Sequence, residues 1–314
     1  MENIAILMGG SSKEKEVSLK SASTIYNYID RSIYIPYKVL CIDKFQFKVI
    51  HNKQEILINN DDFSFNIGNR HIQLHKVFMM IHGAPGENGE LCAYLEEKKI
   101  PYTSCNQKTS ELTFNKFKCN NYLRSLGYKV PNSFLFKDML NVNFPCIIKP
   151  ACSGSSFGIS KVNNETILKN AIQNASKYDK DIIVEEFIEG REVTCGVFRS
   201  GQAIITLPIT EIISENEIFD YDAKYNGKSI EKTPANINVT LQEKIEKISK
   251  EIYKTLKMLG IIRIDFIIKE QHPYIIEINT VPGFSEASII PQMLKHANID
   301  IQDFITKELK RLHS

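Results

Sequence analysis

The sequence predicts an α/β lobe followed by an α+β body in two further lobes. Before about residue 105, short apolar strand patterns run into glycine loops and then into helices, as in parallel α/β lobes. From about residue 106, the strands become short and fit mixed, mostly antiparallel pairing. A chain of 314 residues is long enough for two or three separate cores. We therefore expect lobes at residues 1–105, 106–190 and 191–314.

Two strand–loop–helix units predict the first lobe. The apolar strand 3–8 ends at Gly9-Gly10, and the apolar strand 77–81 ends at His82-Gly83. A helix from about Glu90 follows the second strand, and the helix after the first has one stripe of inward positions: Val17, Ser21, Ile25 and Ile29. In such lobes ligands meet the loops at the carboxyl ends of strands. The two glycine loops are therefore candidate binding loops.

The rest of the chain predicts shorter elements. We expect a helix near 113–126 and another near 165–176, with short strands at 145–149, 182–185 and 192–197. After Gly201 come more strands, then a helix whose apolar residues recur every three or four positions from Leu241 to Leu259, and a closing helix near 300–312. The polar segment 59–69 is expected to be a surface hairpin or loop.

Composition excludes several classes of function. The hydrophobic content of 43% and charged content of 24% are those of an ordinary globular protein, and a net charge of +2 gives no reason to expect nucleic-acid or acidic-membrane binding. Seven cysteines without a CxxC pair indicate neither a disulfide framework nor a zinc site. The sequence shows no signal peptide and no apolar run of membrane-spanning length. We therefore expect a reduced, cytoplasmic protein.

The most informative segment is a hairpin of residues 263–279. Alternation places Arg263 and Asp265 on one face of the first strand, and Glu277 and Asn279 on one face of the second. If the polar turn 269–273 centres near Gln271, Asp265 lies opposite Glu277 and Arg263 opposite Asn279. Two carboxylates and an amide carbonyl are oxygen ligands of the kind that Mg²⁺ takes, with substrate phosphates completing its shell. A solvated, surface-charged hairpin is the alternative.

A loop of small residues, 151–158, directly follows the strand that ends at Lys149-Pro150. Small residues let backbone N–H groups approach an anion, and the preceding lysine adds a positive charge. The loop is not a P-loop, because GxxxxGK[ST] is absent. The sequence therefore predicts a phosphate-binding loop, with a plain linker or turn as the alternative.

Three further segments have both a functional and a structural interpretation. The strand and turn 185–192 could hold a flat heteroaromatic base through Phe187 and Ile188, or could simply connect two lobes. The polar, aromatic segment 219–228 predicts a mobile lid or a crossover loop. The turn 280–288 offers backbone N–H groups near Gly283 to a carboxylate or oxyanion, unless it is an ordinary helix N-terminus.

Taken together, these segments resemble the D-alanine–D-alanine ligases of the ATP-grasp superfamily. The likeness covers nearly the whole chain, in order: GGSSKEKEVS (9–18), HGAPGENG (82–89), KPACSGSSFGISKV (149–162), EEFIEGREVT (185–194), YDAKY (221–225), RIDF (263–266) and EINTVPGFSEASIIP (277–291). Each motif alone is weak, but seven in sequence with compatible spacing are highly specific. The resemblance implies an ATP-grasp fold with an N-terminal α/β lobe that carries the first-substrate loops.

The resemblance also implies a reaction: ATP-dependent joining of two D-alanine molecules through an acyl phosphate, for peptidoglycan precursor synthesis. ATP would lie between the central and C-terminal lobes, with contacts from Lys116, Lys149, Ser156, Glu185, Phe187, Ile188, Glu192 and Lys224. Two Mg²⁺ ions, or Mn²⁺ in their place, would be held by Asp265, Glu277 and Asn279, with Glu277 bridging them. Relatives of this kind are usually dimers, so a homodimer is expected.

The same resemblance assigns the amino-acid sites. Glu14 would meet the amino group of the first D-alanine and belong to a hydrogen-bonded set with Ser155 and Tyr225, and Glu14 is chosen over Glu16 by its distance from Val17-Ser18. His82 and Glu87 would line the first-substrate site. Arg263 and the Gly283 backbone N–H would stabilise the tetrahedral oxyanion, and Ser288 would take the carboxylate of the second D-alanine.

Two departures from the family pattern and two other hypotheses remain. Asn88 stands where HGxxGEDG has aspartate, and 151–153 replaces a loop start that is often charged. D-Lactate or D-serine could be the second substrate, although Tyr225 favours D-alanine in the resemblance. A nucleotide-binding regulator without turnover is a hypothesis of another kind, which the intact Arg263, Ser288 and metal-ligand positions disfavour.

Overall fold

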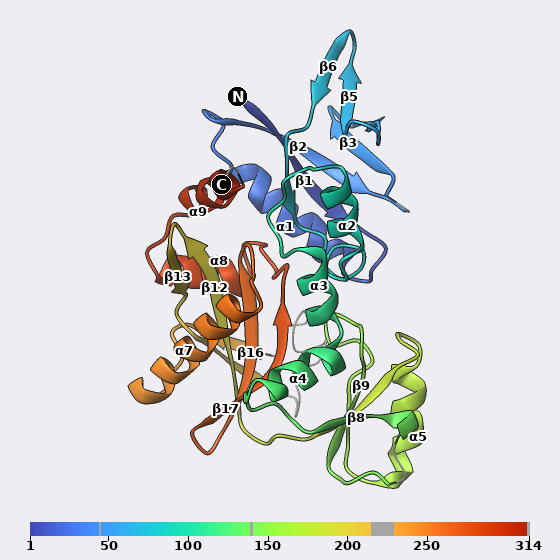
Figure 1. Ribbon diagram of the computed structural model, residues 1–314, viewed down its shortest axis with the longest axis vertical. Helices are drawn as coiled ribbons and strands as arrows, with labels where there is room; N and C mark the ends of the chain where they lie inside the picture. The colour runs from blue at the N-terminus through green and yellow to red at the C-terminus, as the bar shows by residue number, and fades with distance from the viewer. Residues whose placement is uncertain (44, 139–140, 215–228, 313–314) are drawn as a thin grey trace.

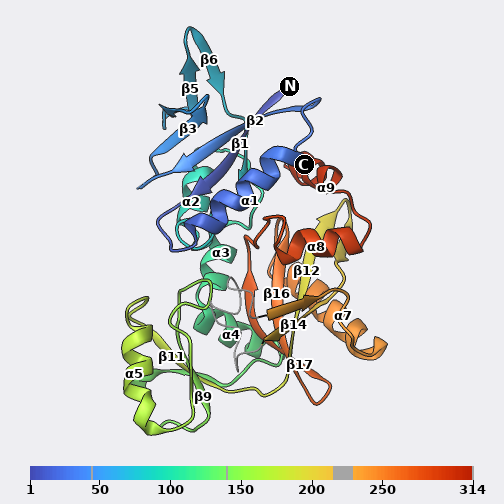
Figure 2. The ribbon, with the colours of Figure 1, turned by 180° about the vertical axis from the view of Figure 1, so that it is seen from behind.

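The computed structural model describes residues 1–43, 45–138, 141–214 and 229–312 (Figure 1). In these ranges the strands form a five-stranded, a four-stranded and a six-stranded sheet, together with a separate two-stranded hairpin. Each of the three larger sheets has its own helices, as Figures 1 and 2 show. The expected combination of an α/β lobe with an α+β body is confirmed.

The five-stranded sheet has the order β4-β3-β2-β1-β7. Its strands are β1 (Glu2–Gly9), β2 (Tyr34–Cys41), β3 (Phe47–His51), β4 (Gln54–Leu57) and β7 (Lys76–Met79). The same region contains the separate hairpin of β5 (Ser64–Ile67) and β6 (Arg70–Gln73), and the helices α1 (Lys15–Tyr28) and α2 (Glu90–Glu97). β1 pairs in parallel with β2 and β7, as expected. β3 and β4 pair antiparallel, because short connections such as Asn52-Lys53 allow only hairpins, so the sheet is parallel at one side only.

The four-stranded sheet has the order β10-β9-β11-β8 and is antiparallel at each pairing. Its region contains α3 (Gln107–Phe114), α4 (Lys116–Ser125), β8 (Ser133–Leu135), a 3-10 turn η1 (Phe136–Asp138), β9 (Cys146–Pro150), β10 (Ser160–Val162), α5 (Glu165–Ala175) and β11 (Ile182–Glu186). The helix expected near 113–126 is α4, which begins at Lys116, and the separate helix α3 before it was not expected. Asn115 has extended backbone between α3 and α4, and its side chain accepts from the Lys118 N–H as the N-cap of α4.

The six-stranded sheet has the order β15-β14-β12-β16-β17, with β13 paired to β12. The elements are β12 (Arg191–Ser200), β13 (Ala203–Thr206), β14 (Thr210–Ser214), β15 (Ser229–Lys232), α7 (Val239–Thr255), β16 (Ile262–Lys269), β17 (His272–Asn279), α8 (Ile289–His296) and α9 (Ile301–Arg311). α7 ends four residues before Leu259, where the expected stripe ended. Lys257 has φ of 51°, which stops the helix, and Leu256 still reaches the core.

The hairpin of β16 and β17 has the predicted pairing but not the predicted geometry. Asp265 lies opposite Glu277 and Arg263 opposite Asn279, although the turn centres between Glu270 and Gln271. A β-bulge between Asp265 and Phe266 shifts the register by one residue and restores the pairing. The bulge leaves Ile276 on the same face as Glu277, so the alternation predicted for this strand is broken there.

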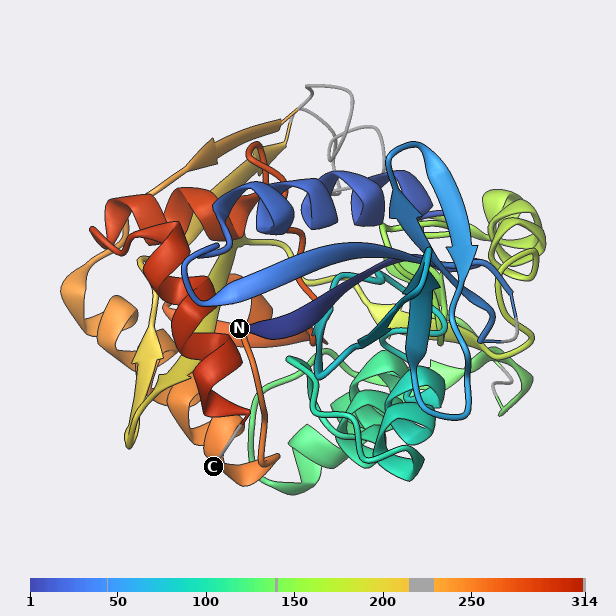
Figure 3. The ribbon, with the colours of Figure 1, turned by 90° about the horizontal axis from the view of Figure 1, so that it is seen from above.

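The two ends of the chain share a core. Residues of β1 and α1 such as Ile25 belong to the same buried cluster as Leu294 of α8 and Phe304 of α9. Figure 3 shows α1 beside the C-terminal helices. Buried Lys76 reinforces this contact, since its Nζ lies 2.9 Å from Glu2 and donates to the Leu309 carbonyl at 3.2 Å. The N-terminal lobe is thereby fixed above one end of β16 and β17.

All seven cysteines are described, and all are free thiols; six are buried and Cys152 is half-buried. No helix in the described ranges combines the length and the apolar character needed to traverse a bilayer.

Candidate active site between the three sheets

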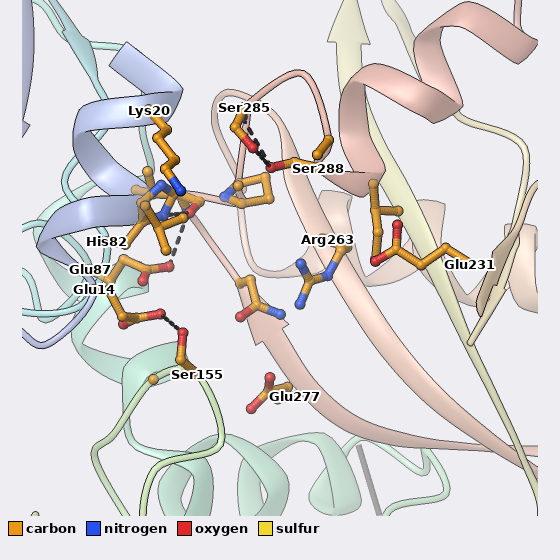
Figure 4. Close-up of a pocket in the computed structure, with 18 residues that line it drawn as sticks. Glu14, Lys20, His82, Glu87, Ser155, Glu231, Arg263, Glu277, Ser285 and Ser288 are labelled. Carbon is orange, nitrogen blue, oxygen red and sulfur yellow. Dashed lines mark hydrogen bonds between the residues drawn. The ribbon is translucent and has the colours of Figure 1, made fainter. Parts of the chain in front are cut away.

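Two neighbouring cavities lie where the three sheets meet. The first has a volume of about 330 Å³, and its polar lining comes from all three lobes: Glu14, Lys20, His82, Glu87, Ser155, Glu231, Arg263, Glu277, Asn279, Ser285 and Ser288 (Figure 4). The second, of about 480 Å³, lies between the four- and six-stranded sheets and is lined by residues including Lys116, Lys149, Ser156, Lys161, Glu185, Phe187, Ile188, Glu192, Asp265, Ile276 and Glu277. Glu277 belongs to both, so the two cavities adjoin at this carboxylate.

The loops after β1 and β9 meet at the floor of the first cavity. Glu14 is the N-cap residue of α1, and the Ser155 hydroxyl donates to its Oε1 at 2.5 Å. Figure 4 shows the two side chains pointing toward one another. The ideal Cβ of a residue in place of Gly154 would lie 2.0 Å from Glu14 Oε2, so glycine is needed for this close approach. The structure therefore brings together two of the three members of the predicted set.

His82 is held by hydrogen bonds at both ring nitrogens. Its Nδ1 lies 2.7 Å from the Val281 carbonyl, which can only accept, so Nδ1 carries the proton. Its Nε2 lies 3.1 Å from the Ser21 hydroxyl, which in turn accepts from the Phe284 N–H. Burial lowers the pKa of His82, so the neutral ring is favoured. His82 thus joins α1 to the chain that follows β17.

Glu87 is a buried carboxyl at the same junction. It accepts from the backbone N–H of Gly83 at 2.8 Å and from that of Val281 at 3.1 Å. Burial raises the pKa of Glu87 to about 7, and the neighbouring charge of Glu14 acts in the same direction. Glu87 therefore fixes the glycine loop to Val281, and its raised pKa favours the protonated form more than in an exposed glutamate.

Arg263 and Asp265 form the side of the cavity made by β16. The Arg263 guanidinium donates to both carboxylate oxygens of Asp265 at 2.8 Å, in the bidentate geometry that fixes a guanidinium plane. Asp265 also accepts from the Thr194 hydroxyl at 2.6 Å and from the Asn279 amide at 3.1 Å. The alternation predicted for β16 is therefore confirmed at this pair.

Glu277 and Lys116 face each other where the cavities adjoin. The Lys116 Nζ lies 3.4 Å from the Glu277 carboxylate and donates to the Ser153 carbonyl at 2.5 Å. Burial alone would lower the pKa of Lys116, but the charge and hydrogen bond of Glu277, with smaller contributions from other glutamates, outweigh it and raise that pKa. A cation from α4 thus lies between the phosphate-loop backbone and the carboxylate of β17.

The donor set of the hairpin fits a hard divalent cation. Asp265, Glu277 and Asn279 offer carboxylate and amide oxygens only, the ligands that Mg²⁺ prefers. In the part of the chain that the structure describes, no group of three His, Cys, Asp or Glu side chains is placed to hold an ion. An ion here would therefore need Asn279 and substrate oxygens as well, as is usual for Mg²⁺.

The second cavity contains a buried ion pair. Lys149 of β9 and Glu185 of β11 lie 2.6 Å apart, and both side chains are almost completely buried. Their strands are antiparallel neighbours, which is why residues 36 positions apart meet. Phe187 and Ile188 follow directly on β11, and Glu192 lies near the start of β12 in the lining of the same cavity. The expected base-holding residues are therefore gathered in one cavity.

The predicted phosphate-binding loop, residues 151–158, has an unusual backbone. Ser155 and Ser156 have φ of 47° and 57°, in the left-handed region that residues other than glycine adopt rarely. Surrounding contacts must hold this conformation, because it costs free energy in an isolated chain. Ser155 lines the first cavity and Ser156 the second, so consecutive serines reach different cavities.

Ser288 closes the first cavity on the side of α8. Its hydroxyl accepts from the Ser285 N–H at 3.0 Å and lies 2.7 Å from the Ser285 hydroxyl. An ideal Cβ at Gly283 would lie 3.1 Å from Ser288 Oγ, so these residues pack closely. The turn 280–288 therefore presents hydroxyl groups and a glycine backbone to the same cavity.

Sequence reasoning missed several lining residues. Glu231 of β15 lies on the side of the first cavity away from Glu14 (Figure 4), accepts from the Gln292 amide at 2.8 Å, and has its pKa raised by burial. Lys161 of β10 has its Nζ 4.1 Å from the centre of the Phe187 ring. Lys161 lies within a recognised motif and Glu231 follows one, but only strand pairing shows that they face the cavities. Lys224 and Tyr225, predicted for the lid, lie outside the described residues.

Two family descriptions match this chain. Residues 3–105 match "D-ala D-ala ligase N-terminus", and residues 123–310 match "D-ala D-ala ligase C-terminus". The chain belongs to the D-alanine–D-alanine ligase family. Curated relatives include the D-alanine–D-alanine ligases of Flavobacterium johnsoniae, 42% identical over 99% of both chains, and of Christiangramia forsetii, 43% identical over 96% of this chain and 95% of the relative.

Solved structures give the same fold. The VanG D-Ala:D-Ser ligase from Enterococcus faecalis has a TM-score of 0.86 and 29% identity, over 99% of both chains. A D-alanine–D-alanine ligase from Bacillus anthracis, complexed with ATP, has a TM-score of 0.78 at 24% identity, over 99% of this chain and 97% of that one. Ligases of this family have the ATP-grasp fold, and the expectation of that fold is confirmed.

Proposed function

We propose that the protein joins two D-alanine molecules into D-alanyl-D-alanine for peptidoglycan precursor synthesis, converting ATP to ADP and phosphate. The observation that carries this proposal is the shared carboxylate of Glu277, at which a cavity lined by polar amino-acid-binding groups adjoins a larger cavity with an apolar, aromatic wall. A substrate carboxylate in the first cavity and a triphosphate in the second would meet there. Membership of the ligase family supports the same reaction.

The first half of the reaction would activate the first D-alanine. Glu14 holds the ammonium group of the first D-alanine, so the carboxylate of that D-alanine points toward Glu277. This substrate carboxylate attacks the γ-phosphorus of ATP, giving an acyl phosphate and ADP. Lys116 and Lys149 offset the phosphate charge as it moves. Ser155 of the phosphate loop would lie beside the intermediate, and Tyr225, outside the described residues, belongs to the same proposed set. Water must be kept from this site, because an acyl phosphate is readily hydrolysed.

Asp265, Glu277 and Asn279 would hold two Mg²⁺ ions, or Mn²⁺ in their place. The ions, when bound, neutralise negative charge on the phosphate oxygens. Within the protein, Arg263 and Thr194 fix the Asp265 carboxylate, and Lys116 fixes that of Glu277. The ligands are thus oriented in advance by contacts within the protein.

The second half would form the peptide bond. Ser288 takes the carboxylate of the second D-alanine, whose amine, once deprotonated, attacks the acyl carbon. Arg263 and the Gly283 N–H stabilise the tetrahedral oxyanion, which collapses with loss of phosphate. His82 and Glu87 do not react. They hold the glycine loop against the chain after β17, so the wall of the first-substrate site is preformed.

The nucleotide would bind in the second cavity. Glu185, Phe187 and Ile188 hold the adenine by strand-edge hydrogen bonds and apolar contact, and Glu192 holds the ribose. Lys149, Ser156 and Lys224 contact the phosphates. The division of the chain into lobes at residues 105 and 190 belongs to the same proposal, since the base would lie at the second boundary.

The proposal is tested by measuring phosphate release from ATP with and without D-alanine, each with and without Mg²⁺. We expect release that needs both D-alanine and the metal ion, and a dipeptide product. L-Alanine is the matched control substrate. Well-folded protein that releases no D-alanine-dependent phosphate would overturn the assignment.

D-Serine and D-lactate are the alternatives for the second substrate. The likeness to a D-Ala:D-Ser ligase at 29% identity makes D-serine worth including. Each is tested in competition with D-alanine across pH. D-Lactate has no amine to deprotonate, so its share of product should fall as the pH rises if the protein uses both. We expect D-alanyl-D-alanine to dominate throughout the neutral range.

We also propose a homodimer that works in the cytoplasm. Membership of the family supports the dimer, and the free state of all seven cysteines fits a reducing compartment. Sedimentation equilibrium tests the dimer, and fractionation of the producing cells tests the location. A mass near the 35.9 kDa of one chain at micromolar concentration would refute the dimer.

A further inference from the structure

Lys13, in the loop after β1, touches two aromatic rings of the central lobe. Its Nζ lies 4.5 Å from the centre of the Tyr178 ring and 5.3 Å from that of Phe157, and 3.4 Å from the Tyr178 hydroxyl. The two rings stack with centres 5.7 Å apart and planes 19° apart. An ammonium at such distances from ring faces is attracted by their quadrupoles. One lysine of the N-terminal lobe thus contacts a residue of the phosphate loop and the ring that supports it.

The phosphate loop is packed closely against Glu14 at its start and against Tyr178 at its end. At its start, Gly154 lies against the Glu14 carboxylate, as described above. At its end, an ideal Cβ at Gly158 would lie 2.8 Å from Tyr178 Cδ2, and Gly158 has φ of 77°. Lys13 and Glu14 are consecutive, so one contacts the ring behind the loop while the other accepts from Ser155 within it.

The loop needs such support because of its backbone. Ser155 and Ser156 are in the left-handed region, where a serine has a steric cost that glycine does not have. Such a conformation persists only when surrounding contacts determine it. The Glu14–Ser155 hydrogen bond determines one side of the loop, and the Lys13–Tyr178–Phe157 contact determines the other.

We propose that Lys13 is a positioning residue that fixes the phosphate loop against the N-terminal lobe, through Tyr178 and Phe157, in the conformation that binds ATP. The inference rests on the proposed function, which makes 151–158 the loop that covers the triphosphate. Lys13 does not touch the reacting atoms. Lys13 would increase the fraction of free protein in which the loop already has the conformation that binds the nucleotide, and so strengthen the apparent affinity for ATP.

A second explanation must be separated from this one. Lys13 is exposed, so its charge alone could attract ATP without any ring contact. Charge attraction would be independent of Tyr178, whereas positioning requires it. A double-mutant cycle between the two residues distinguishes the explanations, because only residues that act through each other give non-additive effects.

The experiment compares Lys13→Gln, Tyr178→Leu and the double variant. KM for ATP and kcat are measured with saturating D-alanine. We expect KM for ATP to rise about two- to fivefold in each single variant, the range given by exposed cation–π contacts, with no further rise in the double variant and with kcat nearly unchanged. A merely structural role would instead lower kcat per mole of protein through loss of folded enzyme and leave KM unchanged. Lys15→Gln, which removes an equal charge from an exposed lysine two residues away, is the matched control and should leave both constants unchanged.

Two further variants sharpen the result. Lys13→Arg should restore the KM for ATP, since a guanidinium also stacks on aromatic rings. Tyr178→Phe should leave KM for ATP close to that of the original protein, because the ring remains and only the 3.4 Å contact with the hydroxyl is lost. An unchanged KM in Tyr178→Leu beside a raised KM in Lys13→Gln would overturn the positioning role in favour of charge attraction. Unchanged KM in both would overturn it outright.

A binding measurement separates failure of this inference from failure of the proposed reaction. The chain has no tryptophan, so Phe157→Trp places a single tryptophan in the phosphate loop. Its emission is titrated with ATP, without turnover, in the Phe157→Trp protein and in the double variant Phe157→Trp/Lys13→Gln. Weaker ATP binding in the double variant shows that Lys13 contributes to ATP binding even if no dipeptide forms. Equally weakened binding in Phe157→Trp/Tyr178→Leu, which keeps the lysine charge, then supports positioning over charge attraction. Equal binding in the two proteins overturns it even if the ligase reaction is established.

Discussion

Asp265 and Glu277 lie opposite one another on β16 and β17, and a β-bulge at the next residue is what aligns them. A regular hairpin with the same turn between Glu270 and Gln271 would place Asp265 opposite Ile276 instead. The extra residue moves both Ile276 and Glu277 to the cavity face. β17 can therefore present an apolar side chain to the second cavity, where we propose that the nucleotide binds, and a carboxylate to the proposed metal site at adjacent positions.

Replacement of that carboxylate should separate an enzyme from a nucleotide-binding regulator. We expect Glu277→Gln to lower kcat by more than about 100-fold, since the charge of a proposed metal ligand is lost and Lys116 loses its charged partner. Phosphate release at saturating ATP, D-alanine and Mg²⁺ is the measurement. Glu270→Gln, in the exposed turn of the same hairpin, is the control and should be as active as the original protein. Full activity in Glu277→Gln would remove this residue from the reaction.

The buried pair Lys149–Glu185 should be far more costly to break than to replace. Lys149→Met leaves the Glu185 charge buried without its 2.6 Å partner, and we expect the free energy of unfolding to fall by about 3–5 kcal/mol. The double variant Lys149→Met/Glu185→Leu should recover most of that loss, although not ATP binding. Urea denaturation measures all three proteins. At the exposed pair Lys48–Glu55, Lys48→Met should change the same quantity by less than about 1 kcal/mol.

Glu87 should make the protein less stable as the pH rises toward neutrality. Its pKa is raised by burial from 4.5 to about 7, so its protonated form stabilises the folded state below pH 4.5, and this contribution is lost by about pH 7. The loss is on the order of 3 kcal/mol. Urea denaturation from pH 4 to pH 8 measures it.

The control for that experiment is Glu87→Gln, which cannot titrate. Glutamine can accept from only one of the two N–H groups, so this variant should be less stable at low pH. The difference between the two proteins should shrink as the pH rises. The opposing titration of His82, whose lowered pKa favours folding at higher pH, occurs in both and cancels in the difference. A difference that stays constant with pH would show that the pKa of Glu87 is the same in the folded and unfolded protein.

Gly154→Ala should weaken binding of the first amino acid. The added methyl group would occupy the position of the Glu14 carboxylate, 2.0 Å from Oε2, and displace it from Ser155. Loss of a hydrogen bond to a charged group corresponds to about a tenfold or larger rise in KM for D-alanine at the first site. Gly201→Ala, in a turn where nothing lies within 4 Å of the added carbon, should not change KM. Unaltered D-alanine kinetics in Gly154→Ala would mean that Glu14 is not the ammonium ligand.

Sequence reasoning located the cavity loops because they follow buried strands, whose carboxyl ends meet at one edge of a sheet. Strand periodicity placed Asp265 and Glu277 on one face of the hairpin, because alternate residues of a strand point to the same side of a sheet. It could not predict the bulge at Ile276, because Ile275-Ile276 has no local signature of an irregular backbone. The break between α3 and α4 was missed although Asn115 is a good N-cap residue, since the apolar pattern continues across it.

Contacts between distant residues were beyond sequence reasoning for another reason. Lys13 and Tyr178 are 165 positions apart, and neither belongs to a periodic pattern that would indicate a partner. Glu231 is on an edge strand whose place in the sheet is known only from its pairing with β14. Periodicity predicts which face of a helix or strand a side chain lies on. It does not predict which distant segment packs against that face, because this depends on the tertiary fold.

The wall of the first cavity is built from both ends of the chain, from Glu14 on α1 to Ile289 on α8. During synthesis, a ribosome that has completed residues 1–190 has made Glu14 and Ser155 but not Arg263, Gly283 or Ser288 of the same cavity wall. A nascent or prematurely terminated polypeptide would therefore lack part of the wall of the first cavity.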